Sequence, residues 1–109
     1  MRQEIHSENN IDSNGNPTGG FARGIGIEIQ WQNGPLGFGT ERTESNGAFV
    51  EGAIEAALQR LRFFQEATSG KFACRQNALA ITKLEEALMW LDNRTGERIH
   101  RGVEGTHQP

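Results

Sequence analysis

Apolar and polar residues alternate along RGIGIEIQWQ, the segment at 23–32. The apolar positions of this segment are Ile25, Ile27, Ile29 and Trp31. A period of two is typical of a strand that buries one face. The Asn33-Gly34 pair that follows favours a hairpin turn, and PLGFGTE at 35–41 is then expected to form a short edge strand beginning with proline. The pattern therefore predicts a β-hairpin region over about 23–42.

Two later segments place apolar residues at helical spacing. The first spans about 48–67, and its stripe consists of Val50, Ile54, Ala57, Leu58, Leu61 and either Phe63 or Phe64. The second spans about 75–101, and its stripe consists of Ile81, Leu84, Leu88 and Leu91. Ser69-Gly70 is expected to end the first helix. A connection this short between two amphipathic helices predicts an antiparallel helical hairpin.

The first twenty residues differ from the rest because they are polar and contain Gly, Asn, Ser and one Pro. This composition predicts a flexible N-terminal arm over residues 1–20. Residues 21–109 are predicted to form a single α+β domain. In it, a small antiparallel β-sheet packs with the long helical hairpin, and a C-terminal tail follows the second helix.

The composition leaves little material for a hydrophobic core. Hydrophobic residues make up 35% of the 109 residues, and 14 residues are glycine. A partner subunit would therefore supply much of the buried surface that so small a domain lacks. The second helix is also apolar on nearly every side at 87–91, which is more than one neighbouring helix can cover. We expect a homo-oligomer.

Charge and cysteine content narrow the possible partners and compartments. The net charge is −3, with an acidic first half and a slightly basic second half. This balance does not favour binding to duplex DNA, but it allows a compact anion such as a nucleotide. Cys74 is the one cysteine, so no intrachain disulfide forms and a reducing cytosol is expected. We expect no membrane span and no signal peptide.

Three arginines occupy one face near the end of the second predicted helix. They are Arg94, Arg98 and Arg101, spaced by four and three residues. One interpretation is that they only offset the helix dipole. The other is a phosphate clamp, because guanidinium groups bind phosphate through two parallel hydrogen bonds. A lysine would offset the helix dipole equally well, so the presence of arginine at all three positions slightly favours the phosphate clamp.

The start of the second helix carries further candidates. Unpaired backbone N–H groups at a helix N-terminus favour an anion. Arg75 places a positive charge at this end, where the helix dipole disfavours a cation, so another reason for the arginine is expected. Asn77 is suited to hydrogen-bond ribose hydroxyls or a base edge. Phe72 is suited either to stack on a purine or to fill the core of the hairpin.

Signatures of catalysis are poor. His6, His100 and His107 lie far apart, and no nucleophile elbow, phosphate-binding loop or metal-ligand cluster occurs. We expect a protein with no catalytic residues, no metal and no cofactor.

Three blocks of the sequence resemble a known family. They are IEIQWQNGPLG at 27–37, NGAFVEGAIEAALQRLRFFQ at 46–65 and KFACRQNALAITKLEEALMWLDNRTGERIHRGVEGT at 71–106. The family is the phage-encoded Thoeris anti-defence family, type one, which shares a helical hairpin domain with the type-two anti-CBASS proteins. The resemblance implies a protein that sequesters a cyclic ADP-ribose isomer without cleaving it and so prevents effector activation. It also implies assembly as dimers or hexamers, and sites in some members for cyclic di- or trinucleotides of CBASS.

The resemblance assigns site residues one by one. Arg75, Asn77 and Arg94 would belong to the ligand pocket, and Arg98 and Arg101 would lie near the phosphates. Phe72 is the candidate for stacking on adenine, with Phe64 as an alternative. Such a protein would act in the cytoplasm of the infected bacterial host. Two other hypotheses stay open, an enzyme that degrades the same messengers and a ligand-free helical hairpin that binds proteins.

Overall fold

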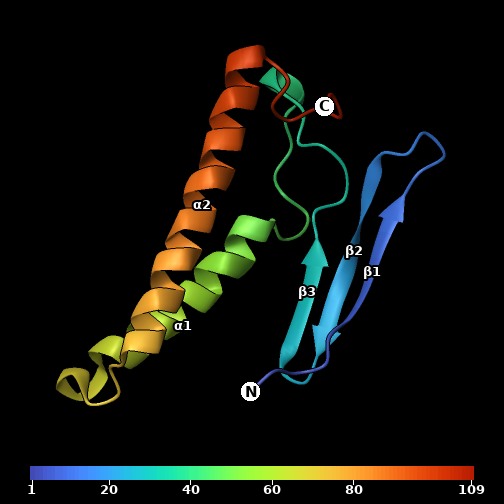
Figure 1. Ribbon diagram of the computed structural model, residues 1–109. Coiled ribbons are helices and arrows are strands. Elements are labelled where there is room, and N and C mark those ends of the chain that lie inside the picture. The colour runs from blue at the N-terminus through green and yellow to red at the C-terminus, as the bar shows by residue number, and fades with distance from the viewer. The chain divides into compact units, whose positions relative to one another are not determined.

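The computed structural model describes residues 1–109 and contains three strands and two long helices (Figure 1). The strands are β1 (His6–Ile11), β2 (Pro17–Gly24) and β3 (Ile27–Trp31), and one 3-10 turn, η1, covers Gly39–Glu41. The helices are α1 (Val50–Gly70) and α2 (Arg75–Arg101). The chain forms two compact units, one of Met1–Phe49 with Arg98–Pro109 and one of Val50–Glu97. The small antiparallel sheet and the helical hairpin that define the predicted α+β class are both present.

The first unit contains a three-stranded antiparallel sheet in the order β1-β2-β3. The flexible arm predicted for residues 1–20 is wrong, because residues 6–11 and 17–20 pair in this sheet. The Asp12 carboxylate closes the β1–β2 turn by accepting backbone N–H bonds from Asn14 (2.8 Å) and Asn16 (3.0 Å). The bond from Asn16 is the main cause that holds the pKa of Asp12 below its usual value. Backbone pairing and this turn, rather than burial, order the polar strand.

The segment predicted as one strand at 23–32 is in fact two strands and a turn. Gly24 pairs with Ile27, so the chain reverses at Ile25-Gly26, where Gly26 has a φ of +74°. The hairpin turn predicted at Asn33-Gly34 and the edge strand predicted at 35–41 are therefore wrong. Residues 35–41 contain only the 3-10 turn η1.

A short parallel bridge holds the chain beside β3 before α1 begins. The Gln32 N–H donates to the Ala48 carbonyl (2.9 Å), and the Ala48 N–H donates to the Gln30 carbonyl (2.7 Å). A Cβ at Gly47 would lie 2.6 Å from the Trp31 carbonyl group, so this approach requires glycine. The bridge fixes the loop between β3 and α1.

The second unit is the predicted antiparallel hairpin of α1 and α2 (Figure 1). α2 spans the residues that the sequence predicts, whereas α1 begins at Val50 rather than at 48. Helical geometry in α1 ends before Ala67, and Thr68 and Ser69 have positive φ. Leu58 is 1% exposed and forms the centre of the hairpin core. Around it the half-buried apolar side chains are Ile54, Leu61, Ile81, Leu84, Leu88 and Leu91.

A glutamine fastens the end of α1 to the start of α2. The Gln65 side chain accepts a hydrogen bond from the Cys74 N–H (2.9 Å) and donates one to the Cys74 carbonyl (3.1 Å). These two bonds satisfy both the backbone N–H and the backbone carbonyl of Cys74. They set where α2 begins, and therefore where the candidate residues Arg75 and Asn77 lie.

Replacing Gln65 with alanine is expected to lower the free energy of unfolding by about 1–2 kcal/mol, since each intramolecular hydrogen bond contributes about 1 kcal/mol. Urea unfolding at a fixed protein concentration measures the change. Gln59→Ala is the matched control, because the Gln59 side chain bonds only the exposed Glu55 carboxylate (3.3 Å). A loss no larger than that of the control would show that the Gln65 bonds do not hold the connection.

Large apolar side chains remain exposed on α2. Met89 is 66% exposed and Trp90 is 73% exposed, both within the segment at 87–91 that the sequence predicts to face another subunit. Oligomerisation stays a prediction, and these two side chains are the surface on which it depends. Neither helix has the length and apolar character needed to cross a membrane.

Candidate functional site

The candidate arginines lie at opposite ends of α2. Arg75 is the first residue of the helix, and Arg94 lies nineteen positions later. At about 1.5 Å per residue, the two backbone positions are about 28 Å apart along the helix. A single diphosphate cannot reach both within one copy of the chain. Any site that uses both residues needs a second copy.

At the start of α2, the structure exposes the proposed stacking ring. Phe72 is 56% exposed, so it does not fill the core of the hairpin, and the Lys71 Nζ lies 5.5 Å from the ring centre. The Cys74 sulfur accepts a hydrogen bond from the backbone N–H of Asn77 (3.4 Å) and so caps the helix. Arg75 follows Cys74 and is exposed.

The alternative stacking ring, Phe64, is already in contact with a cation. The Arg60 guanidinium lies 4.8 Å from the ring centre of Phe64 and 4.9 Å from that of Phe63. The two rings pack edge to face, with their centres 5.7 Å apart. Of the two candidates, Phe72 lies closer in sequence to Arg75 and Asn77.

Arg94 presents an accessible guanidinium on the helical hairpin. Its side chain is 60% exposed, and its nearest carboxylate is that of Glu51, at 3.9 Å. An exposed ion pair at this distance contributes little to folding. A phosphate could therefore replace Glu51 as the partner of Arg94 at low cost.

Arg98 is differently placed, because its two terminal nitrogens hold the C-terminal arm, which we define as residues 102–109. Nη1 donates to the carbonyls of Gln108 (2.8 Å) and Pro109 (3.1 Å). Nη2 donates to those of Val103 (3.0 Å) and Thr106 (3.2 Å). Arg101 also donates to the Pro109 carbonyl (3.0 Å). The sequence places Arg98 on the same face as Arg94, but the structure gives the two arginines different partners.

A second contact holds the C-terminal arm. The Arg42 guanidinium forms a two-pronged ion pair with the Glu104 carboxylate, at 2.6 and 2.9 Å. Beside it, the Gly37 N–H donates to the Gly105 carbonyl (2.7 Å). Sequence reasoning did not identify Arg42 or Glu104. They lie 62 residues apart, and no local spacing connects them.

Acidification is expected to release this contact. The hydrogen bond from Arg42 is the main cause that holds the pKa of Glu104 below its usual 4.5. Because the folded pKa is the lower one, the stabilisation is complete above the unfolded pKa and is lost as the pH falls through the folded pKa. Amide NMR shifts of Gly37 and Gly105, followed from about pH 6 to pH 2.5, should show this step. Glu104→Gln should remove it, and persistence of the step in that variant would assign it to another group.

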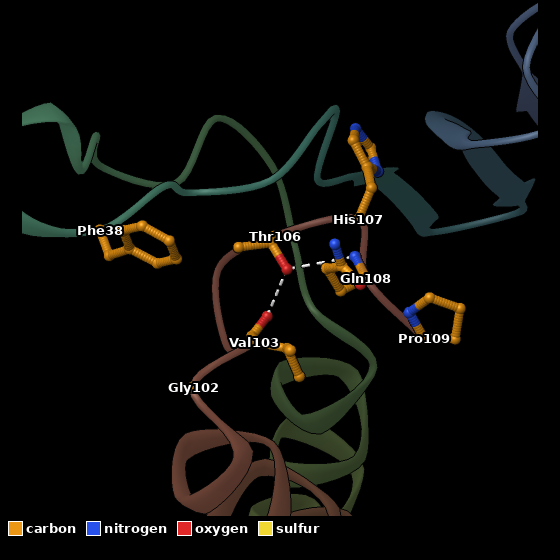
Figure 2. A pocket seen from close by; sticks show the side chains of 7 residues that line it. All are labelled: Phe38, Gly102, Val103, Thr106, His107, Gln108 and Pro109. Carbon is orange, nitrogen blue, oxygen red and sulfur yellow. Dashed lines mark hydrogen bonds between the residues drawn. The ribbon is translucent and has the colours of Figure 1, made fainter.

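An open hollow lies beside the C-terminal arm (Figure 2). Its volume is about 740 Å³, and it is lined by Phe38, Gly102, Val103 and residues 106–109. Thr106 orders this wall, since its hydroxyl donates to the Val103 carbonyl (2.6 Å) and accepts the Gln108 N–H (3.1 Å). The Phe38 ring is 57% exposed. The volume falls within the range of small-molecule sites, about 300–1,000 Å³.

Comparison with known proteins places the hairpin in a family. The family described as the Acb2/Tad1 hairpin domain matches residues 24–96, which include Phe72, Arg75, Asn77 and Arg94 and stop before Arg98. A protein named Thoeris anti-defense 1, from Bacillus phage SBSphiJ7, is 51% identical over 80 residues. The alignment covers 73% of this chain and 51% of that protein, so the chain spans about half the length of this relative. The chain therefore belongs to the Acb2/Tad1 hairpin family, that of the Thoeris anti-defence proteins.

Proposed function

We propose that this protein is a phage anti-defence protein that binds a cyclic ADP-ribose isomer and holds it without cleaving it. The messenger is thereby withheld from the effector in the cytoplasm of the infected bacterium. The observation that carries the proposal is the exposed arginine surface of α2, with Arg75 at one end and Arg94 near the other. The name of the phage relative, Thoeris anti-defense 1, supports the same function.

The proposed ligand needs fixed cations, a stacking surface and hydroxyl partners. Arg75 and Arg94 provide the cations, and each charge-assisted hydrogen bond to a phosphate contributes about 1.5–3 kcal/mol. The exposed Phe72 ring provides the stacking surface, and Asn77 provides an amide for ribose hydroxyls. Binding requires no nucleophile, which agrees with the poor catalytic signatures of the sequence.

Sequestration requires enclosure as well as charge. A nanomolar complex corresponds to about −12 kcal/mol, which a flat and fully hydrated surface does not provide. In an antiparallel pair of copies, the Arg75 end of one α2 would approach the Arg94 end of the other. Such a pair would spread the cations around one ligand despite the 28 Å or so that separate them in a single copy. We therefore place the ligand between copies of a dimer, or of dimers within a hexamer.

The direct test is recovery of the messenger. After mixing with excess protein, a cyclic ADP-ribose isomer should disappear from the ultrafiltrate and return chemically unchanged when the protein is heated or digested. Mass spectrometry distinguishes the intact ring from a linear product. Recovery of a linear product at more than one turnover per site would establish the degrading enzyme instead.

A thermal-shift series addresses ligand choice. Cyclic ADP-ribose isomers should raise the melting temperature, because a ligand that binds only the folded state stabilises it. Cyclic di- and trinucleotides form a second series that tests for CBASS messengers. Absence of a shift in both series would favour a ligand-free hairpin that binds proteins.

A further inference from the structure

The chain contains three Asn-Gly pairs, and the structure places each in a different setting. They are Asn14-Gly15, Asn33-Gly34 and Asn46-Gly47. In such a pair the backbone nitrogen of the glycine can attack the side-chain amide of the asparagine, because glycine has no Cβ to obstruct the approach. The attack requires an asparagine side chain that is free to rotate and a glycine N–H that no acceptor holds.

Two of the pairs lack one of these conditions. The Gly15 N–H donates to the Asp12 carbonyl within the β1–β2 turn (3.0 Å). The Asn46 side chain is held at both ends, since its Oδ1 accepts the Asn33 N–H (2.8 Å) and its Nδ2 donates to the Asn33 carbonyl (2.9 Å). At either pair, hydrogen bonds must break before the attack can begin.

The Asn33-Gly34 pair meets both conditions. Asn33 is exposed, its side chain makes no hydrogen bond, and the Gly34 N–H has no acceptor. The carbonyl of the peptide bond between the two residues also accepts the hydrogen bond from the Asn46 Nδ2. When the Gly34 nitrogen loses its proton, resonance spreads the negative charge onto that carbonyl oxygen, where the Asn46 amide stabilises it. The contacts therefore leave the Asn33 side chain free and favour the attacking nitrogen.

We propose that Asn33 is a modification site, at which the chain converts its own asparagine into aspartate and iso-aspartate. The Gly34 nitrogen gives its proton to hydroxide and forms a bond to the Asn33 Cγ. The Cγ–Nδ2 bond then breaks, and the leaving group takes a proton from water and departs as ammonia. Water opens the resulting cyclic imide. Opening at Cγ gives aspartate, and opening at the main-chain carbonyl gives iso-aspartate, whose backbone runs through Cβ and Cγ.

Iso-aspartate at position 33 would loosen the link between β3 and the segment before α1. The Asn33 N–H and carbonyl bind one amide together, that of Asn46, and an additional backbone atom between them prevents both bonds from being kept. The Asn46 N–H in turn donates to the Gln32 side chain (2.8 Å). Two residues further on, Ala48 pairs with the backbone of Gln30 and Gln32. The modification is therefore expected to weaken the parallel bridge at Ala48, independently of any ligand.

The experiment compares the three sites within the full-length protein. The folded protein is incubated at mildly alkaline pH, and peptide mass spectrometry measures the conversion of each asparagine over time. Asn33 should convert about 5- to 30-fold faster than Asn46, because two hydrogen bonds must break before the Asn46 amide can rotate. Asn33 should also convert faster than Asn14. In urea the contacts are lost, and the three rates should become similar. Equal rates in the folded protein, or an advantage of Asn33 that persists in urea, would overturn the proposal.

Asn46→Asp tests the contribution of the neighbouring amide. The aspartate keeps an acceptor for the Asn33 N–H but has no donor for the Asn33 carbonyl. Conversion of Asn33 should slow by about 3- to 10-fold, since a hydrogen bond to a charged acceptor contributes more than one to a neutral acceptor. An unchanged or faster conversion would show that Asn46 does not promote the reaction.

Hydrogen exchange measures the structural consequence. After incubation, the fraction that contains iso-aspartate should lose protection at the Ala48 amide, which donates to the Gln30 carbonyl (2.7 Å). The Cys74 amide, held by Gln65 in the other unit, should keep its protection and is the internal control. Asn33→Gln is the matched variant, because its longer side chain forms a cyclic imide far more slowly. Protection at Ala48 that survives in the iso-aspartate fraction, or is lost equally from incubated Asn33→Gln, would contradict the expected loosening.

Discussion

Replacing Arg94 with alanine is expected to lower the affinity for a cyclic ADP-ribose isomer by about 10- to 100-fold. The reason is the loss of one charge-assisted hydrogen bond, which contributes about 1.5–3 kcal/mol. The fold should be unaffected, because the Arg94 side chain is 60% exposed and its ion pair with Glu51 spans 3.9 Å. Isothermal titration calorimetry measures the affinity, and size-exclusion chromatography with light scattering checks that assembly is unchanged.

Arg62→Ala is the matched control for this experiment. Arg62 lies in the same unit, is partly exposed and pairs with Glu85 at 2.9 Å, but the ligand assignment does not include it. Its removal should leave the affinity within about 2-fold of the unaltered protein, which is the range of surface substitutions outside a site. Equal affinities for Arg94→Ala and the unaltered protein would show that the clamp is wrongly assigned.

The helical hairpin could be predicted closely from the sequence because its signals are local and agree with one another. Leu84, Leu88 and Leu91 recur at the helical period, and the α2 boundaries follow from that pattern. The end of α1 was predicted less closely, because helical geometry already ends before Ala67 and Thr68 is the first residue with positive φ, ahead of Ser69-Gly70. Periodicity therefore locates both helices, whereas the exact end of α1 depends on the backbone of the connection.

The sheet was harder to predict for two physical reasons. The turn at Ile25-Gly26 lies inside an alternating run, and alternation records which positions are apolar without recording that the chain reverses. β1 is exposed along its whole length and has no apolar residue before Ile11, so it shows no alternating hydrophobic pattern. The residues that could have indicated the two turns are the glycines at 24 and 26 and Asp12, whose carboxylate closes the first turn.

The candidate site also has a part that local sequence patterns predict and a part that they do not. Helical spacing placed Arg94 and Arg98 on one face, and that placement depends only on the helix. The partner of Arg98 depends on where the arm returns, which is set by Arg42 and Glu104 across 62 residues. No local pattern contains that contact. Spacing therefore identified the cations, whereas only the structure showed which of them is already occupied.

Trp90→Asp is expected to prevent assembly with little effect on the folding of a single copy. Trp90 is 73% exposed within one chain, so an aspartate there meets water and costs little. In an assembly that covers the 87–91 segment, the same carboxylate would be buried without a partner, at a cost of several kcal/mol. A cost of about 4 kcal/mol raises the dissociation constant about 1,000-fold. Sedimentation equilibrium measures the change.

Two comparison variants make the Trp90 result specific to the surface. Thr82→Asp adds the same charge at another exposed position of α2 and should leave the molecular mass unchanged. Leu88→Asp should lose both assembly and monomer stability, because Leu88 is half-buried inside the hairpin. An unchanged mass for Trp90→Asp would mean that no copy covers this segment. If that mass is the mass of one chain, the ligand would have to bind within the chain, where Arg75 and Arg94 cannot share a diphosphate, and the enclosed-messenger mechanism would fail.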